Sequence, residues 1–148
     1  MDKYEEKAIS DIEKHGCHIL SVIEDDEGPT FSYSIGIEES NSHPEIIITG
    51  LPSDFAQLLI NDYNARVKDG EVFEVDKMYD GFLEGFEVTF KLVEKKHYKE
   101  YFGWAQWLYK DKPYRVLQLI YPNTSGVWVW DKEADDDLKW FIPRLYAH

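Results

Sequence analysis

The stretch from residue 31 to residue 70 constrains the fold more than any other part of this chain. Residues 31–37 alternate apolar and small side chains and predict a strand, whereas the apolar run at 46–49 predicts a buried strand. A short polar loop joins the two strands. Pro52 follows in a turn, and apolar side chains at helical spacing then predict a helix over 53–68. The stretch therefore predicts a strand–loop–strand–helix unit.

Similar patterns extend this architecture along the chain, whose 148 residues suit a single domain, 1–148. Apolar stripes at helical spacing predict two further helices, at 2–15 and 95–109. Further strands are predicted at 17–23, 72–75, 86–92, 114–121 and 127–130, a loose turn region at 80–85 and an acidic loop at 131–137. About three helices among these strands predict an α+β fold with a mainly antiparallel or mixed sheet. The alternative is a sheet that curls into a small barrel.

The charge of the chain narrows the choice of partners. The sequence holds 29 acidic and 16 basic side chains, a net charge of −13, and residues 1–54 alone hold 13 acidic and 3 basic ones. A negative field of this kind repels the phosphates of nucleic acids and anionic lipid heads, so neither is an expected partner. It favours a basic protein partner, and plain solubility is the alternative explanation. The acidic residues predicted to contact such a partner are Glu24, Asp25, Asp26, Glu38 and Glu39.

The single cysteine and the N-terminus indicate where the protein resides. Cys17 is alone, so the chain can form neither an internal disulfide nor a multi-cysteine metal site. The acidic turn at 24–29 lacks the ligand spacing of a calcium loop, and no metal site is expected. The first residues are charged, without the apolar segment of a secretory signal, and no apolar run approaches the length of a membrane span. We therefore expect a cytoplasmic protein.

Common catalytic and phosphate-binding signatures are absent from the sequence, but six side chains are candidates for a ligand site. They are His43, Glu45, Asn61, Gln118, Trp128 and Trp130. His43 stands in a loop directly before a buried strand, where sites often lie, although local turn chemistry explains the same pattern. Asn61 and Gln118 interrupt apolar faces, and a polar group buried there needs a partner. Trp128 and Trp130 are two residues apart, so on a strand they share a face that belongs to the core or stacks a flat ligand.

Several of these segments occur in one known family. The succession of residues 31–37, 43–52, 58–61 and 117–130 resembles the bacterial DUF4262 family, a domain of unknown function. The resemblance covers roughly residues 15–131 and supplies no catalytic residues. Family members usually have a Trp-Pro-Asp turn followed by Phe-Pro-Trp, whereas this chain has Tyr-Pro-Asn at 121–123 and Val-Trp-Val-Trp thereafter. The strand–loop–strand–helix unit is also similar in pattern to flavin-reductase-like split barrels, without any flavin motif.

Two functional hypotheses follow. The leading one is an acidic cytoplasmic domain that binds a basic protein partner, in the manner of an immunity or inhibitor protein, with no identified catalysis. The alternative is a domain or enzyme that binds a small flavin- or nucleotide-like ligand in a pocket near His43 and the face of Trp128 and Trp130. No cofactor is identified by the sequence.

Overall fold

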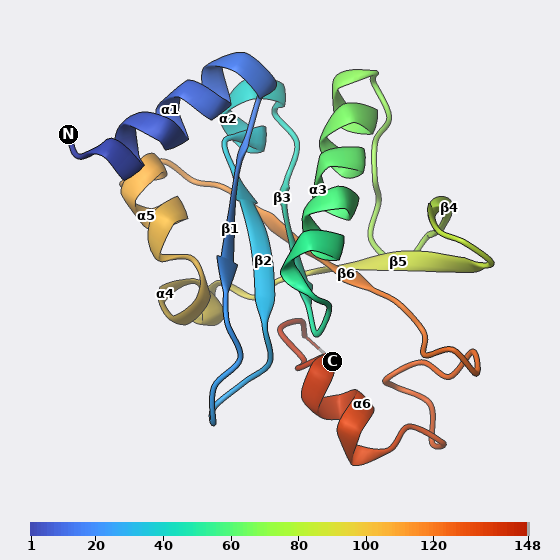
Figure 1. Cartoon of the computed structure of the whole chain (residues 1–148). Helices are drawn as coiled ribbons and strands as arrows, with labels where there is room; N and C mark the ends of the chain where they lie inside the picture. Colours follow the sequence, from blue (N-terminus) through green and yellow to red (C-terminus); the bar gives the residue numbers. More distant parts are fainter. Residues whose placement is uncertain (148) are drawn as a thin grey trace.

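The computed structural model describes residues 1–147, which form an α+β fold built on one mixed sheet (Figure 1). The helices of this part of the chain are α1 (Lys3–His15), α2 (Ile37–Asn41), α3 (Ser53–Lys68), α4 (Tyr98–Tyr101), α5 (Gly103–Tyr109) and α6 (Asp136–Phe141), and a short 3₁₀ helix, η1 (Lys95–His97), precedes α4. The strands are β1 (His18–Val22), β2 (Phe31–Ile35), β3 (Glu45–Thr49), β4 (Met78–Leu83), β5 (Phe86–Leu92) and β6 (Val116–Ile120).

The six strands lie in the order β1-β2-β3-β6-β5-β4. All neighbouring pairs are antiparallel except β3 and β6, which run parallel with Ile46 opposite Leu117. The prediction of a mixed, mainly antiparallel sheet is thus confirmed. The sheet is not closed into a barrel, because β1 and β4 form its two edges. The barrel alternative was wrong because alternating apolar strands satisfy an open sheet equally well when helices cover both faces.

Helices cover the two faces of the sheet and create two apolar clusters. On one face, α3 packs Leu59, Ile60 and Tyr63 against the apolar side chains of β3, β5 and β6. On the other face, α4 and α5 pack with the intervening Phe102 against β2 and β3, and Tyr109 of α5 belongs to the same cluster. The bulk of the aromatic residues therefore belongs to these two cores, which fix the positions of the strand ends where the pockets lie.

The first helix shows how directly local sequence sets an element. The side chain of Asp2 accepts a hydrogen bond from the Glu5 amide at 2.8 Å, and the Glu5 carboxylate accepts one from the Asp2 amide at 3.1 Å. This reciprocal cap satisfies two free amides at the start of α1. Gly16 then ends the helix in the left-handed conformation, with φ of 92°. The predicted helix at 2–15 is confirmed.

Residues 72–75, predicted as a strand, form no strand. Their alternation is real, because Phe73 is buried and Val72 and Val75 are exposed. The Phe73 amide, however, donates its hydrogen bond to the Nε2 atom of His43 at 3.1 Å instead of to a neighbouring strand. A side chain has taken the place of a neighbouring strand as hydrogen-bond partner. The alternation of apolar and polar residues is the same in both cases, so the sequence pattern cannot tell them apart.

Residues 127–130 also form turns rather than the predicted strand, since the Trp128 amide donates to the Asp131 carboxylate and the Asp131 amide to the Trp128 carbonyl. Sequence patterns missed three elements: α2 in the polar loop, β4, which overlaps the predicted turn region at 80–85, and α6, which begins at the end of the predicted acidic loop. The Asp135 side chain accepts from the Leu138 amide at 2.9 Å and caps α6. An acidic cap followed by two further acidic residues was the available signal for that helix.

The predicted helix at 95–109 is divided into η1, α4 and α5. Phe102 departs from helical geometry, with φ of −118° and ψ of 48°, and Gly103 follows it. Phe102 is fully buried and packs edge-on against Tyr33 and Tyr98. Phe and Gly both have low helix propensity, so packing the Phe102 ring against the core is favoured over continuing the helix through these two residues.

Candidate functional site

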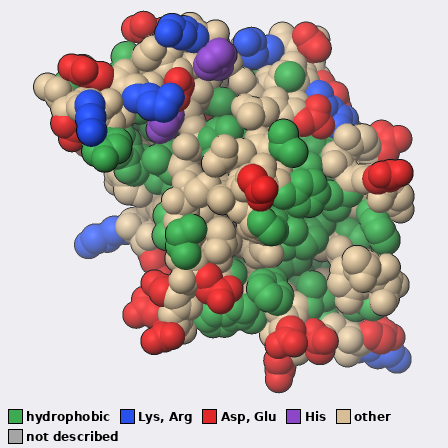
Figure 2. Space-filling model, viewed as in Figure 1, with side chains coloured by type: hydrophobic (Ala, Val, Ile, Leu, Met, Phe, Trp, Pro, Cys, Tyr) green, Lys and Arg blue, Asp and Glu red, His purple; other side chains and the backbone are tan. Residues whose placement is uncertain are grey.

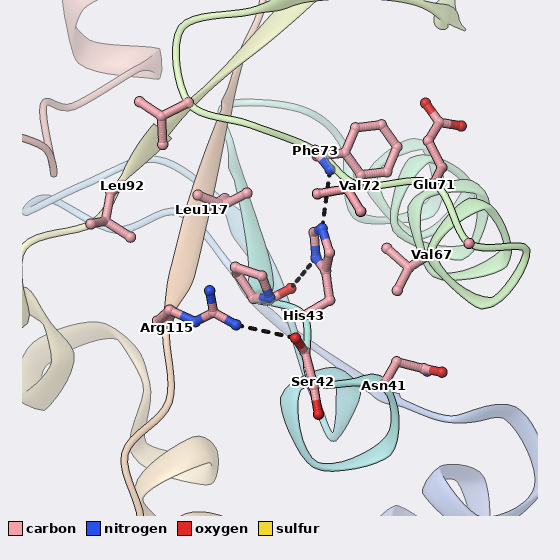
Figure 3. Close-up of a pocket in the computed structure, with 13 residues that line it drawn as sticks. Asn41, Ser42, His43, Val67, Glu71, Val72, Phe73, Leu92, Arg115 and Leu117 are labelled. Carbon is pink, nitrogen blue, oxygen red and sulfur yellow. Dashed lines mark hydrogen bonds between the residues drawn. The ribbon is translucent and has the colours of Figure 1, made fainter.

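A pocket of about 450 Å³ lies where the parallel strands β3 and β6 begin (Figure 3). The end of α2, the end of α3, the segment at 70–75 and the last residue of β5 surround it. Its polar lining includes Ser42, His43 and Arg115, and its apolar lining includes Val67 and Leu117. We call it the His43 pocket.

Both ring nitrogens of His43 are occupied by the protein itself. Its Nε2 atom accepts from the Phe73 amide, which leaves the proton on Nδ1, and Nδ1 donates to the Tyr63 hydroxyl at 2.9 Å. The Tyr63 hydroxyl in turn donates to the Pro44 carbonyl at 2.8 Å. Burial lowers the pKa of His43, consistent with a neutral ring. His43 therefore ties the segment at 70–75 to the start of β3, and it has no nitrogen free for acid–base chemistry.

Glu45, two residues after His43, is buried and does not line the pocket. Its carboxylate accepts five hydrogen bonds, from the Ser34 hydroxyl, the backbone amides of Gly36, Ile37 and Glu38, and the Tyr109 hydroxyl. These donors favour the anion, but full burial opposes it and raises the pKa of Glu45 to about 7. The carboxylate positions the start of α2 against β3, which is a structural role that sequence alone did not separate from ligand binding.

Arg115 stands at the pocket immediately before β6 and was not predicted as a site residue. Its Nε and Nη2 atoms donate to the two carboxylate oxygens of Glu38 at 2.8 and 2.7 Å, and Nη2 also donates to the Ser42 carbonyl at 3.2 Å. The guanidinium is thereby fixed in place, and it holds the pKa of Glu38 below its usual range, against the opposing effect of burial. Glu38, predicted to contact a partner, is thus engaged inside the protein.

The six predicted ligand residues do not converge on this pocket, where only His43 is part of the lining. Asn61 lies exposed on α3, and its neighbour Asn64 is the buried one, donating to the His15 carbonyl at 2.8 Å. Gln118 is fully buried, donates to the Pro143 carbonyl at 2.9 Å and so holds the C-terminal segment on the sheet. A role of these residues in ligand binding stays a prediction.

Trp128 and Trp130 stack on one another, with ring centroids 5.2 Å apart and planes 6° apart. Trp128 packs against the core on the α3 side, and the ammonium of Lys91 lies 5.1 Å from the ring centroid of Trp130. Neither tryptophan lines the His43 pocket. The two side chains share a side through a turn rather than a strand, and Trp130 is still 47% exposed.

A second pocket, of about 460 Å³, lies at the opposite end of the parallel strands, beyond the carboxyl ends of β3 and β6. Its apolar walls are formed by Leu51, Phe55, Leu83, Phe86, Tyr121 and Phe141. We call it the apolar groove. Gly50 forms its floor with φ of 81°, where a side chain would meet the Phe141 carbonyl. The close approach of α6 to the end of β3 therefore depends on glycine at this position.

Acid-rich segments adjoin the lining of the apolar groove. Residues 24–27, 84–87 and 131–137, which we call the acidic rim, hold eleven acidic side chains and one basic side chain. Glu84 lines the groove itself, and Glu24 lines a smaller adjoining pocket together with Leu51 and Phe141. Figure 2 shows a hydrophobic area with Asp and Glu along the lower margin of the molecule, whereas Lys, Arg and His stand among further Asp and Glu near the top. Acidic side chains therefore lie at both ends of the sheet.

The five predicted partner-binding acids are likewise divided between the two ends of the sheet. Glu24, Asp25 and Asp26 form the exposed tip of the β1–β2 hairpin, next to the apolar groove. Glu38 and Glu39 belong to α2, at the other end of β2 (Figure 1). The five acids do not form one continuous surface, because the chain crosses the length of the sheet between the two groups.

Within residues 1–147, no group of three His, Cys, Asp or Glu side chains is arranged to hold a metal ion. None of the helices in this range is long and apolar enough to cross a membrane. Comparison with protein families gives a match to a model described as "Domain of unknown function (DUF4262)", over residues 11–135. No curated protein and no solved structure matches the chain.

Proposed function

The chain belongs to the DUF4262 family, whose function is unknown, and we propose from its own geometry that it is a binding domain for a basic protein partner. The partner docks on the apolar groove, and its positive side chains meet the acidic rim. The observation that carries the proposal is an apolar depression that has Glu84 in its lining, Glu24 in the adjoining pocket and the acid-rich segment 131–137 directly before Leu138 of its wall. An immunity or inhibitor protein that covers a basic target has this combination of features.

The apolar groove supplies the part of the contact that is insensitive to salt. Phe55 and Phe141 are partly exposed, and Leu58 is more exposed still on the adjoining surface of α3. Covering such side chains removes apolar area from water, at about 25 cal/mol per Å². A partner segment with apolar side chains on one face would therefore be retained by the groove.

The acidic rim attracts a basic partner and disfavours an acidic one. Of its members, Glu24 and Asp26 make no side-chain hydrogen bond among the described residues, whereas Asp25 accepts from the amides of Glu27 and Gly28 and shapes the hairpin tip. At physiological salt, the attraction between exposed charges extends over about 8 Å before it is largely screened. The proposal therefore assigns Glu24, Asp26 and Glu84 to the contact and leaves Glu38 and Glu39 outside it.

The test uses two model peptides, an amphipathic helix of leucine and lysine and its counterpart of leucine and glutamate, titrated into the labelled protein while amide shifts are recorded by NMR. We expect only the lysine peptide to bind. The shifts should centre on Leu51, Glu84 and Phe141, and binding should weaken as salt is added, since exposed charges are screened.

Matched variants separate this surface from general charge. Glu24→Lys with Asp26→Lys should weaken binding several-fold, because each exposed ion pair contributes about 0.2–1 kcal/mol. Glu6→Lys with Glu13→Lys changes the net charge equally on α1, far from the groove, and should leave most of the affinity. Equal binding of both peptides, or an equal loss in both variants, would refute the proposal.

A further inference from the structure

We propose that the His43 pocket is a second, independent binding site, for a small organic carboxylate with an aliphatic tail. The carboxylate would meet Arg115 and the tail would lie against the aliphatic wall of the pocket. This inference does not rest on the partner-binding proposal, because the His43 pocket and the apolar groove lie at opposite ends of the parallel strands β3 and β6.

The walls of the His43 pocket suit an aliphatic chain. Val67, Leu117 and Pro44 form its inner surface. At its mouth, Val72 and Leu92 are 64% and 49% exposed, so apolar side chains from two separate segments face solvent beside one opening. Exposed apolar side chains gathered at a cavity of this size are typical of a ligand site.

Arg115 provides the one charged donor that remains available to a ligand. Its Nε and Nη2 atoms are taken by Glu38 and the Ser42 carbonyl, whereas Nη1 has no hydrogen-bond partner among the described residues. In Figure 3 this second terminal nitrogen points away from Ser42, toward the side of the pocket where Leu117 lies. A guanidinium fixed by its other nitrogens loses little freedom when it binds a carboxylate oxygen.

The two carboxylates nearest the pocket are each paired with an arginine, Glu38 with Arg115 and Glu71 with Arg66. Glu71 lines the pocket, but both of its carboxylate oxygens accept from Arg66, at 2.8 and 2.7 Å. His43 is neutral and has both nitrogens engaged, so it forms part of the wall and adds no charge. One free guanidinium nitrogen beside a mostly aliphatic cavity matches a monoanionic carboxylate better than a phosphate, which needs several donors.

The test is a titration with octanoate, followed by the amide shifts of the complete chain, with octan-1-ol and octylammonium as comparators. We expect octanoate to shift the amides of Ser42, Phe73 and Leu117, and the alcohol and the ammonium to bind more weakly. N-acetyl-alanyl-leucine carries the same carboxylate at a peptide end. Tighter binding of that peptide, or equal binding of octan-1-ol, would overturn the proposal, as would the absence of any shift with octanoate.

Substitutions test the two parts of the site, the Arg115 guanidinium and the apolar mouth, separately. Arg115→Gln should weaken octanoate binding about tenfold, since a hydrogen bond to a charged group is lost. Val72→Glu places a negative charge at the exposed mouth, where folding tolerates it, and should also weaken binding. Arg144→Gln removes the same charge at a residue that does not line the pocket and is the control. Unchanged binding in Val72→Glu, or an equal loss in Arg144→Gln, would refute the assignment.

Discussion

Replacing Glu45 with glutamine tests whether burial or hydrogen bonding governs the ionisation of the carboxylate at the start of α2. One carboxylate oxygen accepts from Ser34 and Ile37, and the other accepts from three donors. Glutamine keeps one acceptor oxygen and presents an NH₂ group in place of the other. Ser34 can reverse its hydrogen bond, but the buried Ile37 amide would lose its acceptor. Such a loss costs about 1–3 kcal/mol.

In the wild-type protein, ionisation of the buried Glu45 lowers the folding stability by an amount that depends on pH. The pKa of Glu45 is about 7 when folded, above the ordinary value of 4.5. Between these values the folded state binds a proton that the unfolded state does not, so stability falls as pH rises through this window. At about 1.4 kcal/mol per pH unit, the whole change amounts to about 3 kcal/mol. Glu45→Gln cannot titrate there and lacks this decline.

The assay is guanidinium unfolding of both proteins at about pH 5 and about pH 8. We expect Glu45→Gln to be the less stable protein at the lower pH, and the difference to shrink by about 2.5 kcal/mol at the higher pH. Comparing the two proteins cancels the other groups, including His43, whose lowered pKa gives the opposite slope. Glu39→Gln, an exposed change in α2, is the control and should show no such trend. A stability difference that is constant or grows with pH would refute the reasoning, because the carboxylate would then be ionised throughout.

Two further substitutions test the contacts that place the pockets. Gly50→Ala should lower stability by about 2 kcal/mol or more, because its φ is 81° and the new carbon would lie 2.5 Å from the Phe141 carbonyl oxygen; thermal unfolding measures this, and an unchanged melting temperature would contradict it. His43→Leu should cost about 2–4 kcal/mol, since the Phe73 amide and the Tyr63 hydroxyl lose their partner. Hydrogen exchange should then accelerate at Phe73 far more than at Ile47 in β3, and uniform acceleration would show a global effect instead.

The strand–loop–strand–helix unit at 31–70 was predictable because its signals are local. The apolar run of β3, the Pro52 turn and the spacing of apolar side chains in α3 each depend on residues close in sequence. The same holds for α1, whose caps are formed by neighbours. The segments at 72–75 and 127–130 failed for the opposite reason: the hydrogen bonds that decide them come from His43 and from a turn at Asp131.

The candidate site shows the same division. His43 was correctly singled out as a loop residue before a buried strand, and it does line a pocket. Arg115 carries no local signal, because its importance comes from Glu38 and Ser42, more than 70 residues away in the chain. Gln118 and Glu45 were recognisable as polar groups in apolar strands, but only the structure identifies their partners within the protein.

The sequence by itself determined the fold class, the family, the size of the negative charge and most helices and strands, because composition and periodicity are properties of short windows. Only the tertiary structure decided where the acidic side chains lie and which of them are paired. Residues 1–54 appear uniformly acidic in the sequence, but β2 carries the chain from the hairpin tip at Glu24 to α2 at the other end of the sheet. The hairpin joins the acids around α6 beside the apolar groove, whereas Glu38 pairs with Arg115. Strand order decides which charged side chains lie near one another, and that order is set by pairing between strands that are far apart in the sequence.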